Sequence, residues 1–97
     1  MIFEWDEAKN RANIRKHGLD FADAAQMFNG PVLARPDSRA DYGEPRWIGS
    51  GMINGRLAFT AFTQRSGNTI RIISLRKASR EERKEYENAI QNRLGPY

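Results

Sequence analysis

The only histidine of this 97-residue chain, His17, is the one side chain whose ordinary pKa, ~6.5, suits proton transfer near neutral pH. It lies between Lys16 and Gly18, near the expected end of a helix. Lys9 and Asn13 stand two turns and one turn before it, so a polar stripe follows one side of that helix. We expect this stripe to contact RNA or His17 to move protons. A histidine in the last turn of a helix also interacts with the terminal carbonyls, and a solvated helix face gives the same pattern.

A second candidate site lies where the last expected strand passes into the final helix. Its cations are Arg76, Lys77 and Arg80, and free backbone N–H groups at a helix start add to their attraction for phosphate. Such a site can stabilise the charge that builds on phosphorus when a ribose 2′-hydroxyl attacks its own 3′-phosphate, a cleavage that needs no metal or cofactor. The nearest titratable partners are Glu82 and Tyr86. Glu82 also fits a capping box, and Tyr86 also fits the core.

The amino-acid composition argues against metal-dependent and thiol chemistry. The chain has no cysteine, which excludes disulfides, zinc–cysteine sites and thiol catalysis, and one histidine excludes a multi-histidine metal site. Asp37, Asp41 and Glu44 could hold Mg²⁺ beside a phosphate. Loops collect such residues for solubility, and Glu44 could instead pair with Arg46. We therefore expect no metal and no cofactor.

Positive charge is concentrated in the second half of the chain. Residues 1–48 carry seven Lys and Arg against eight Asp and Glu, whereas residues 49–97 carry nine against four. Twelve of the sixteen cations are arginine, whose planar fork binds phosphate and stacks on bases. This indicates an RNA-binding surface, the alternative being an arginine-rich composition on ordinary exposed edges. From Pro45 to Arg80 there is no acidic residue, but there are seven cations: Arg46, Arg56, Arg65, Arg71, Arg76, Lys77 and Arg80.

Capping residues and apolar spacing predict two helices near the N-terminus, after a short edge strand over residues 2–5. Asp6 is placed to cap the first helix, which ends near His17 with Gly18 as a left-handed stop. Asp20 caps a second helix, which an Asn-Gly-Pro sequence ends. Its apolar face repeats at i, i+3, i+4 and i+7 and consists of Phe21, Ala24, Ala25 and Phe28.

A period of two in the hydropathy from residue 46 onward predicts an antiparallel meander. Its first turn, Asn54-Gly55, suits type I′. A short strand at 32–34 and an exposed loop at 35–45 precede the meander. Ser79 and Glu82 form a capping box that opens a final helix to about Arg93, closed by Gly95-Pro96. The meander strands are expected at Arg46–Ile53, Arg56–Arg65 and Thr69–Arg76.

The expected register sorts the meander side chains into two faces. The more continuously apolar face should receive the helices and leave the mixed face for RNA. A one-residue slip at the second turn would place Arg71 rather than Arg76 on the mixed face. The mixed face holds Trp47, Ala58, Thr60, Phe62, Ile72, Ser74 and Arg76, and the apolar face holds Ile48, Phe59, Ala61, Ile73 and Leu75.

The element order β-α-α-β-β-β-β-α predicts one α+β domain over residues 1–97, with two N-terminal helices and a C-terminal helix packed on an antiparallel sheet. No apolar run approaches the ~18 residues that span a bilayer. The first ten residues are acidic where a secretory signal would be basic and then apolar. We therefore expect a cytoplasmic protein with no membrane contact.

Four ordered blocks carry a resemblance to a known family: WDEAKNRANIRKHG at 5–18, FADAAQMF at 21–28, DYGEPRWIG at 41–49 and IRIISLRKASREERKEY at 70–86. Across nearly its whole length the chain resembles the BrnT family of type II toxins, small ribonucleases with a RelE-like fold. The first and last blocks are the specific ones, whereas the apolar helix is not diagnostic.

The resemblance implies an endoribonuclease that arrests growth and is held inactive by a cognate BrnA-type antitoxin, within a higher-order toxin–antitoxin hetero-oligomer. In the wider RelE-like group the RNA lies on the sheet. The expected RNA-binding residues are Lys16, Arg46, Arg65, Lys77 and Arg80, and the expected catalytic residues are His17, Arg71, Arg76, Glu82 and Tyr86.

Two other classes of function remain possible from the residues alone. In a non-catalytic RNA- or DNA-binding module, the same arginines would only neutralise phosphates. In a protein-interaction subunit, the basic face would receive an acidic strand or helix of a partner.

Overall fold

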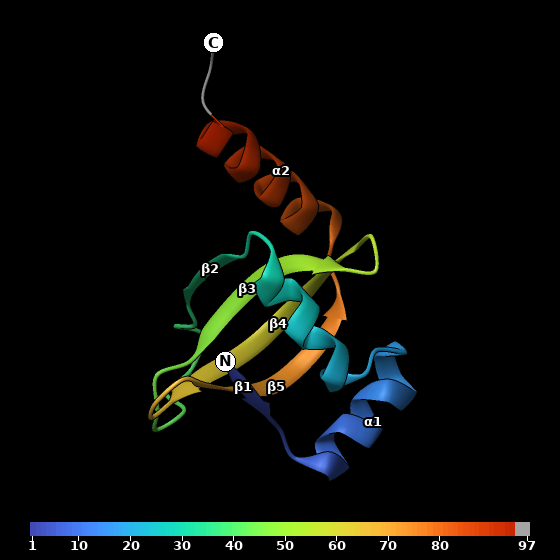
Figure 1. The fold of residues 1–97 in the computed structure, drawn as a ribbon, viewed down its shortest axis with the longest axis vertical. Coiled ribbons are helices and arrows are strands. Elements are labelled where there is room, and N and C mark those ends of the chain that lie inside the picture. Colours follow the sequence, from blue (N-terminus) through green and yellow to red (C-terminus); the bar gives the residue numbers. More distant parts are fainter. Residues whose placement is uncertain (95–97) are drawn as a thin grey trace.

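In this computed structural model, which describes residues 1–94, the strands form one five-stranded sheet (Figure 1). Gly95-Pro96, the expected helix stop, lies outside the described residues. No helix within 1–94 is long and apolar enough to cross a membrane. In chain order the elements are β1 Ile2–Glu4, α1 Glu7–His17, η1 Phe21–Asn29, β2 Leu33–Pro36, β3 Trp47–Ile53, β4 Arg56–Arg65, β5 Thr69–Lys77 and α2 Arg80–Leu94.

The strand order in the sheet is β1-β5-β4-β3-β2. The meander of β3, β4 and β5 is antiparallel as predicted, and β2 adds to it antiparallel along β3. β2 takes in Arg35 and Pro36, which the sequence had suggested for the loop. β1 pairs parallel with β5, so the expectation of a purely antiparallel sheet is wrong. The long excursion between β1 and β5 permits this pairing, because parallel neighbours need a crossover rather than a hairpin.

The predicted caps of the first two helices and the predicted Asn54-Gly55 turn are confirmed. The Asp6 side chain accepts from the Lys9 N–H at 3.0 Å, and Gly18 ends α1 with φ 72°. Asp20 accepts from the Ala22 N–H at 2.9 Å. Asn54 and Gly55 both have positive φ, 50° and 77°, as a type I′ turn requires.

The second helix is a 3₁₀ helix rather than the expected α-helix. Its fully buried side chains are Phe21, Ala24 and Met27, which recur every third residue. This matches the three residues per turn of a 3₁₀ helix, in which one row of side chains points the same way. Phe28 is half-buried and packs between the rings of Phe3 and Phe62.

A β-bulge in β5 decides which side chains point to which face of the sheet. Phe62 pairs with Ile72 as expected, but Ala61 pairs with Ser74, so Ile73 is an extra residue on β5. The alternation of side chains is offset beyond it. We call the two sides the helical face, with Ala58, Phe62, Ile72 and Leu75, and the arginine face, with Ile48, Phe59, Ala61, Ser74 and Arg76.

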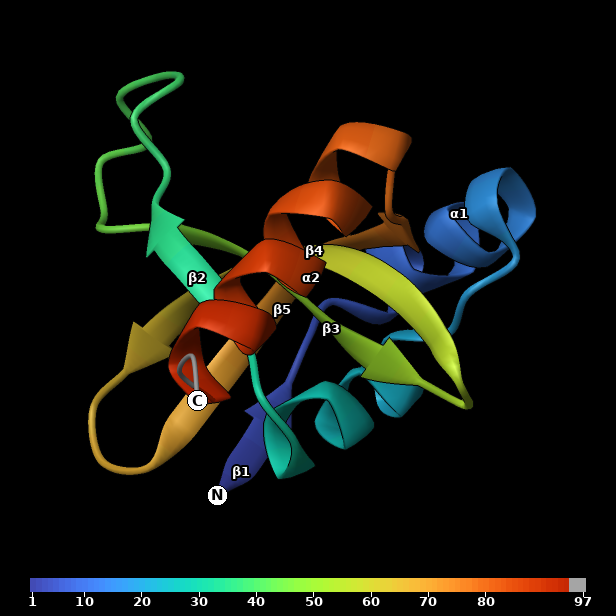
Figure 2. The ribbon, with the colours of Figure 1, turned by 90° about the horizontal axis from the view of Figure 1, so that it is seen from above.

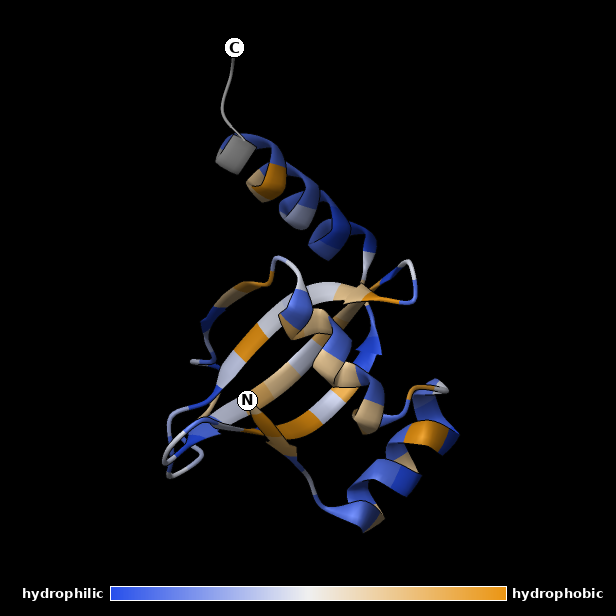
Figure 3. Ribbon diagram, viewed as in Figure 1, coloured by the Kyte–Doolittle hydropathy of each residue, from blue (hydrophilic) through white to orange (hydrophobic). Residues whose placement is uncertain are grey.

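The helical face receives η1, whose Phe21 and Met27 pack in one buried cluster with Phe62 and Leu75. The prediction that helices would cover the Phe59 side is therefore wrong for η1. Gly51 is one reason, since a Cβ there would lie 3.1 Å from the Met27 Cβ, so the bare backbone lets η1 sit close to β3. In Figure 3, η1 lies in front of the sheet and carries most of the apolar residues found in helices, while α1 and α2 are largely hydrophilic.

The two α-helices lie at the margins of the sheet. α1 packs along the end of β5. α2 starts on the arginine face and projects from the body, so that the whole molecule is 47 Å long (Figure 1). Figure 2 shows η1 and α2 on opposite sides of the sheet. The arginine face is thus flanked by α1 and α2.

Candidate functional site

Arg76 is the most highly organised cation on the arginine face. Its Nη1 and Nη2 donate to the two carboxylate oxygens of Glu82 at 2.9 and 2.8 Å, and Nη1 also donates to the Lys77 carbonyl at 3.1 Å. The guanidinium lies over the ring of Phe59, 4.3 Å from its centroid. Such a two-point ion pair and a ring beneath the guanidinium fix its plane.

One edge of Arg76 is left for a ligand. Nη1 and Nη2 donate to Glu82 from the far end of the guanidinium. The Nε–H and the second Nη2 hydrogen, which lie along its side, form no hydrogen bond within residues 1–94. The side chain as a whole is 38% exposed. Two parallel N–H donors match two oxygens of a phosphate.

Glu82 is bound at the start of α2 as the predicted capping box. Its N–H donates to the Ser79 hydroxyl at 3.1 Å, and its carboxylate accepts from the Ser79 N–H at 2.8 Å. Burial by itself raises the pKa of this carboxyl, but hydrogen bonds from Arg76 and Ser79 and the charge of Arg76 outweigh it, so the pKa lies below its ordinary value. Glu82 is therefore held as a carboxylate that orients Arg76.

His17 lies at the end of α1 on a shallow hollow that we call the His17 hollow. Lys9 and Lys16 of α1 and Ile73 and Ser74 of β5 also line it. Ser74 and Arg76 point to the same face of β5, two residues apart and so about 7 Å along the strand. The His17 hollow therefore reaches the arginine face two residues along β5 from Arg76.

Two buried asparagines position α1. The Asn13 side chain donates to the Leu75 carbonyl at 2.8 Å and accepts from the Leu75 N–H at 3.2 Å, so it pairs with β5 as a neighbouring strand would. It also donates to the Leu19 carbonyl at 3.0 Å. Asn10 accepts from the Phe21 N–H and donates to Asp20, which fixes the junction with η1. Asn13, which the sequence placed in the polar stripe, is therefore a buried anchor.

The other expected cations of the arginine face lie away from Arg76. Arg71 points to the same face because of the bulge, but it lies five residues away along β5 and donates to Glu4 of β1 at 2.6 Å. Arg46 and Arg65 both pair with Glu44, at 3.4 and 3.6 Å, near the other end of β4. The expected Glu44–Arg46 pair is therefore confirmed. These residues are not brought together with His17 and Arg76.

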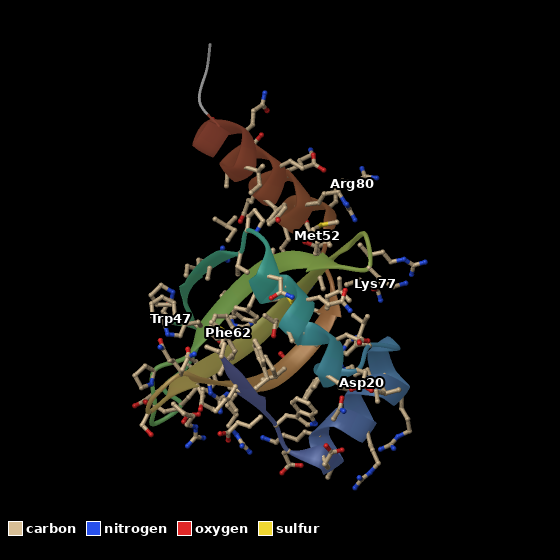
Figure 4. All side chains as sticks on the ribbon, in the orientation of Figure 1. Asp20, Trp47, Met52, Phe62, Lys77 and Arg80 are labelled. Carbon is tan, nitrogen blue, oxygen red and sulfur yellow. The ribbon has the colours of Figure 1, made fainter. Side chains whose placement is uncertain are left out.

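Lys77, Arg80 and Tyr86 differ in what they can reach. Lys77 points to the helical side, away from Arg76, and Arg80 is exposed at the start of α2; Figure 4 shows both at the end of the sheet near Met52. Tyr86 is 8% exposed, and its hydroxyl donates to the Pro31 carbonyl at 2.9 Å. Its visible role is to anchor α2.

The carboxylates weighed for a metal are otherwise engaged. Asp37 is held by two hydrogen bonds of 2.8 Å from the Arg39 guanidinium, which keeps the pKa of its carboxyl far below the ordinary value. Asp41 accepts from the Gly43 N–H. Among residues 1–94, no three His, Asp or Glu side chains are grouped so that they could hold a metal ion.

Sequence reasoning missed two residues of this site. The sequence predicts Phe59 on the helix-covered face, yet its ring lies under the Arg76 guanidinium. Ser74, which the sequence does not mark for chemistry, lines the His17 hollow and lies two residues from Arg76 on the same face. A one-residue bulge leaves the hydropathy alternation readable on both sides, so it gives no clear signal in the sequence. Only the structure therefore shows which side chains of β5 point to which face of the sheet.

Two comparisons with known proteins find a match. A family model described as "Ribonuclease toxin, BrnT, of type II toxin-antitoxin system" matches residues 5–82. A 1.1 Å crystal structure of the ribonuclease toxin BrnT from Brucella abortus is similar, with a TM-score of 0.61 and 32% sequence identity, over 82% of this chain and 100% of that chain. No curated protein matches the sequence.

Proposed function

The chain belongs to the BrnT family of ribonuclease toxins of type II toxin–antitoxin systems, and from this we propose that it cleaves RNA on its arginine face without a metal ion. The observation that carries the proposal is the partly exposed Arg76 side chain, whose guanidinium Glu82 and Phe59 hold in place while its Nε–H and one Nη2 hydrogen form no hydrogen bond within residues 1–94. A guanidinium fixed before the substrate arrives stabilises charge with little reorganisation.

In the proposed reaction, the ribose 2′-oxygen attacks the adjacent phosphorus and the bond to the 5′-oxygen breaks. The products are a 2′,3′-cyclic phosphate and a free 5′-hydroxyl, so no water or cofactor is consumed. Arg76 binds the non-bridging oxygens as their charge grows. His17, on the adjacent hollow, takes the 2′-hydroxyl proton or protonates the leaving oxygen.

The remaining expected residues take supporting roles in this proposal. Glu82 is a positioning residue for Arg76, because its carboxylate is already bound by Arg76 and Ser79. Lys16, on the same hollow as His17, binds a flanking phosphate. Tyr86 holds α2 in place through Pro31, and Arg71 holds β1 through Glu4.

We also propose that a BrnA-type antitoxin covers the arginine face within a hetero-oligomer in the cytoplasm. Antitoxin and RNA would then compete, and an acidic antitoxin segment would suit these arginines. If excess RNA fails to slow antitoxin binding, the shared surface is wrong. The RelE-like fold stays a prediction from the family resemblance.

RNA cleavage by the purified protein in EDTA tests the proposed chemistry. Arg76→Ala should lower the cleavage rate by roughly 100-fold or more, the usual loss when a transition-state donor is removed. His17→Ala should lower it by roughly 100-fold or more, the usual contribution of a general acid or base. Arg76→Lys, which keeps the charge but loses the fork, should stay well below the wild type.

Arg15→Ala is the matched control, since Arg15 is exposed on α1 and does not line the His17 hollow. Thermal unfolding of each variant separates lost activity from lost structure. Cleavage that vanishes in EDTA and returns with Mg²⁺ would overturn the metal-free mechanism. RNA that is bound but never cut, with or without Mg²⁺, would favour the non-catalytic binding module.

A further inference from the structure

A second hollow lies at the end of the sheet, on the helical side, and we call it the Lys77 hollow. It has a volume of about 360 Å³, within the usual range of ~300–1,000 Å³ for small-ligand sites. One wall is the junction of α1 and η1 at Gly18 and Leu19, and the opposite wall is the β3–β4 hairpin. The Gln26 side chain accepts from the Asn54 N–H at 3.1 Å and ties η1 to this hairpin.

The charges of the Lys77 hollow suit an anionic ligand with a polar edge. Arg56 and Lys77 line it, and neither forms an ion pair within residues 1–94. Asp23 also lines it, half-buried, and likewise has no cationic partner among those residues. Leu19, Ile53, Leu57 and Ala58 supply apolar surface. The two cations suit the phosphate of a nucleotide, and the carboxylate suits the hydrogen-bonding edge of its base. The apolar wall suits the face of the base ring.

The Lys77 hollow lies at the same end of β5 as the proposed cleavage site, but on the opposite face of the sheet. Arg76 and Lys77 are consecutive in β5, so they are one residue, about 3.3 Å, apart along the strand and point to opposite faces. A single RNA strand that crosses this end of the sheet would pass from Arg76 to Lys77. Arg80, exposed at the same end (Figure 4), would lie beside that path.

From these observations we propose that the Lys77 hollow binds one nucleotide of the RNA strand next to the scissile phosphate, and that it selects guanine; this rests on the proposed function. Arg56 and Lys77 bind the phosphate. The Asp23 carboxylate, which only accepts hydrogen bonds, faces the base edge. Guanine offers it two adjacent donors, N1–H and N2–H, whereas the other bases offer one donor next to an acceptor. The site thus helps to set where RNA is cut.

Nucleotide binding to the ¹⁵N-labelled protein, followed by NMR, tests the site without using activity. Addition of 5′-GMP should shift the amide signals of Gly18, Asp23 and Asn54 and bind more tightly than 5′-AMP, 5′-UMP or inorganic phosphate. The double variant Arg56→Gln/Lys77→Gln should weaken GMP binding by about tenfold or more, through loss of its charge-assisted contacts. Asp23→Asn should remove the preference for GMP over AMP.

The matched control is Arg11→Gln/Arg15→Gln, which loses the same charge from exposed residues of α1 that do not line the Lys77 hollow. The inference is overturned if GMP leaves the three amides unshifted, if inorganic phosphate binds as well as GMP, or if the two double variants behave alike. RNA cleavage by the same wild-type sample separates the two proposals. Cleavage without GMP binding sinks only the nucleotide site, and GMP binding without cleavage sinks only the proposed reaction.

Discussion

Single side chains in this protein serve the fold and the site in ways that their residue types alone do not reveal. Asn13 stands in the same polar stripe as Lys9 and His17, yet it is 8% exposed and is hydrogen-bonded to Leu75 and Leu19. It satisfies the backbone of β5 at the point where β1 no longer pairs with it. An amide can do this because it carries both a donor and an acceptor.

Asn13→Ala should therefore lower the free energy of unfolding by about 2–3 kcal/mol, because it strands buried backbone groups of Leu75. Urea unfolding measures this change. Asn88→Ala, at an exposed position of α2, is the control and should stay within about 0.5 kcal/mol of the wild type. Equal stability of the two variants would contradict the anchoring role of Asn13.

Glu82 gives the protein a pH-dependent contribution to stability. Its pKa is lowered in the folded protein, so the carboxylate stabilises the fold fully above the ordinary glutamate pKa of ~4.3, and this is lost as pH falls through the lower folded pKa. Glu82→Gln should be less stable than the wild type at neutral pH, and the gap should close on acidification. Urea unfolding across that pH range tests this.

Glu87→Gln is the matched control for Glu82→Gln, since Glu87 is exposed on α2 and forms no ion pair within residues 1–94. The Glu87→Gln variant should follow the wild type at every pH. A gap for Glu82→Gln that stays constant down to acid pH would show that the lost stability does not come from the charge of Glu82.

At the scale of elements, η1 depends on a backbone contact with β3. A Cβ on Gly51 would lie 3.1 Å from the Cβ of Met27 and 3.4 Å from its carbonyl oxygen, so η1 sits directly on the strand. Buried side chains at every third position of η1 then reach the sheet from a 3₁₀ helix. The close approach decides which face of the sheet is covered.

Gly51→Ala should lower the free energy of unfolding by about 1–3 kcal/mol, because the methyl group displaces η1 from β3. Gly30→Ala is the control, since a Cβ there meets nothing within 4 Å and its φ is not positive. That control should stay within about 0.5 kcal/mol of the wild type. If thermal or urea unfolding finds both variants unchanged, the contact between Gly51 and Met27 is not tight.

At the scale of the whole molecule, the charge of the sheet surface depends on which side chains the fold brings together as ion pairs. The stretch from Pro45 to Arg80 has no acidic residue, yet four of its arginines pair with glutamates that lie outside it. These arginines are Arg46, Arg65, Arg71 and Arg76. The sheet is therefore less positive than the sequence suggests. The pairs of Arg46 and Arg65 with Glu44 are long, at 3.4 and 3.6 Å, and surface ion pairs contribute only about 0–1 kcal/mol, so RNA phosphates can replace Glu44 there.

Glu44→Gln should free Arg46 and Arg65 for phosphate, since both pair with Glu44. With a 2′-O-methyl RNA, which has no free 2′-hydroxyl, the slope of log affinity against log salt should steepen by up to ~1.4, about 0.7 for each added phosphate. Glu87→Gln removes the same charge and should leave the slope unchanged. Equal slopes for the two variants would mean that RNA does not reach this end of the arginine face.

Local chemistry was readable from the sequence. The starts of the helices were predicted from their capping residues Asp6, Asp20 and Ser79, and one turn was predicted from Asn54-Gly55. These predictions work because each residue acts on neighbours a few positions away in the chain. The four motif blocks led to the family for the same reason, since the residues in each block are close along the chain. Of the candidate site, Arg76, Glu82 and His17 could be named in advance.

Only the tertiary structure decided how these pieces combine. The extra residue Ile73 places Arg76 over Phe59, Gly51 brings η1 onto the other face, and β1 pairs with β5 across more than sixty residues. Each outcome depends on contacts between segments far apart in sequence, and a one-residue offset reverses the direction of every later side chain in a strand. The sequence thus determined which residues and elements this protein has, and long-range packing determined which of them meet.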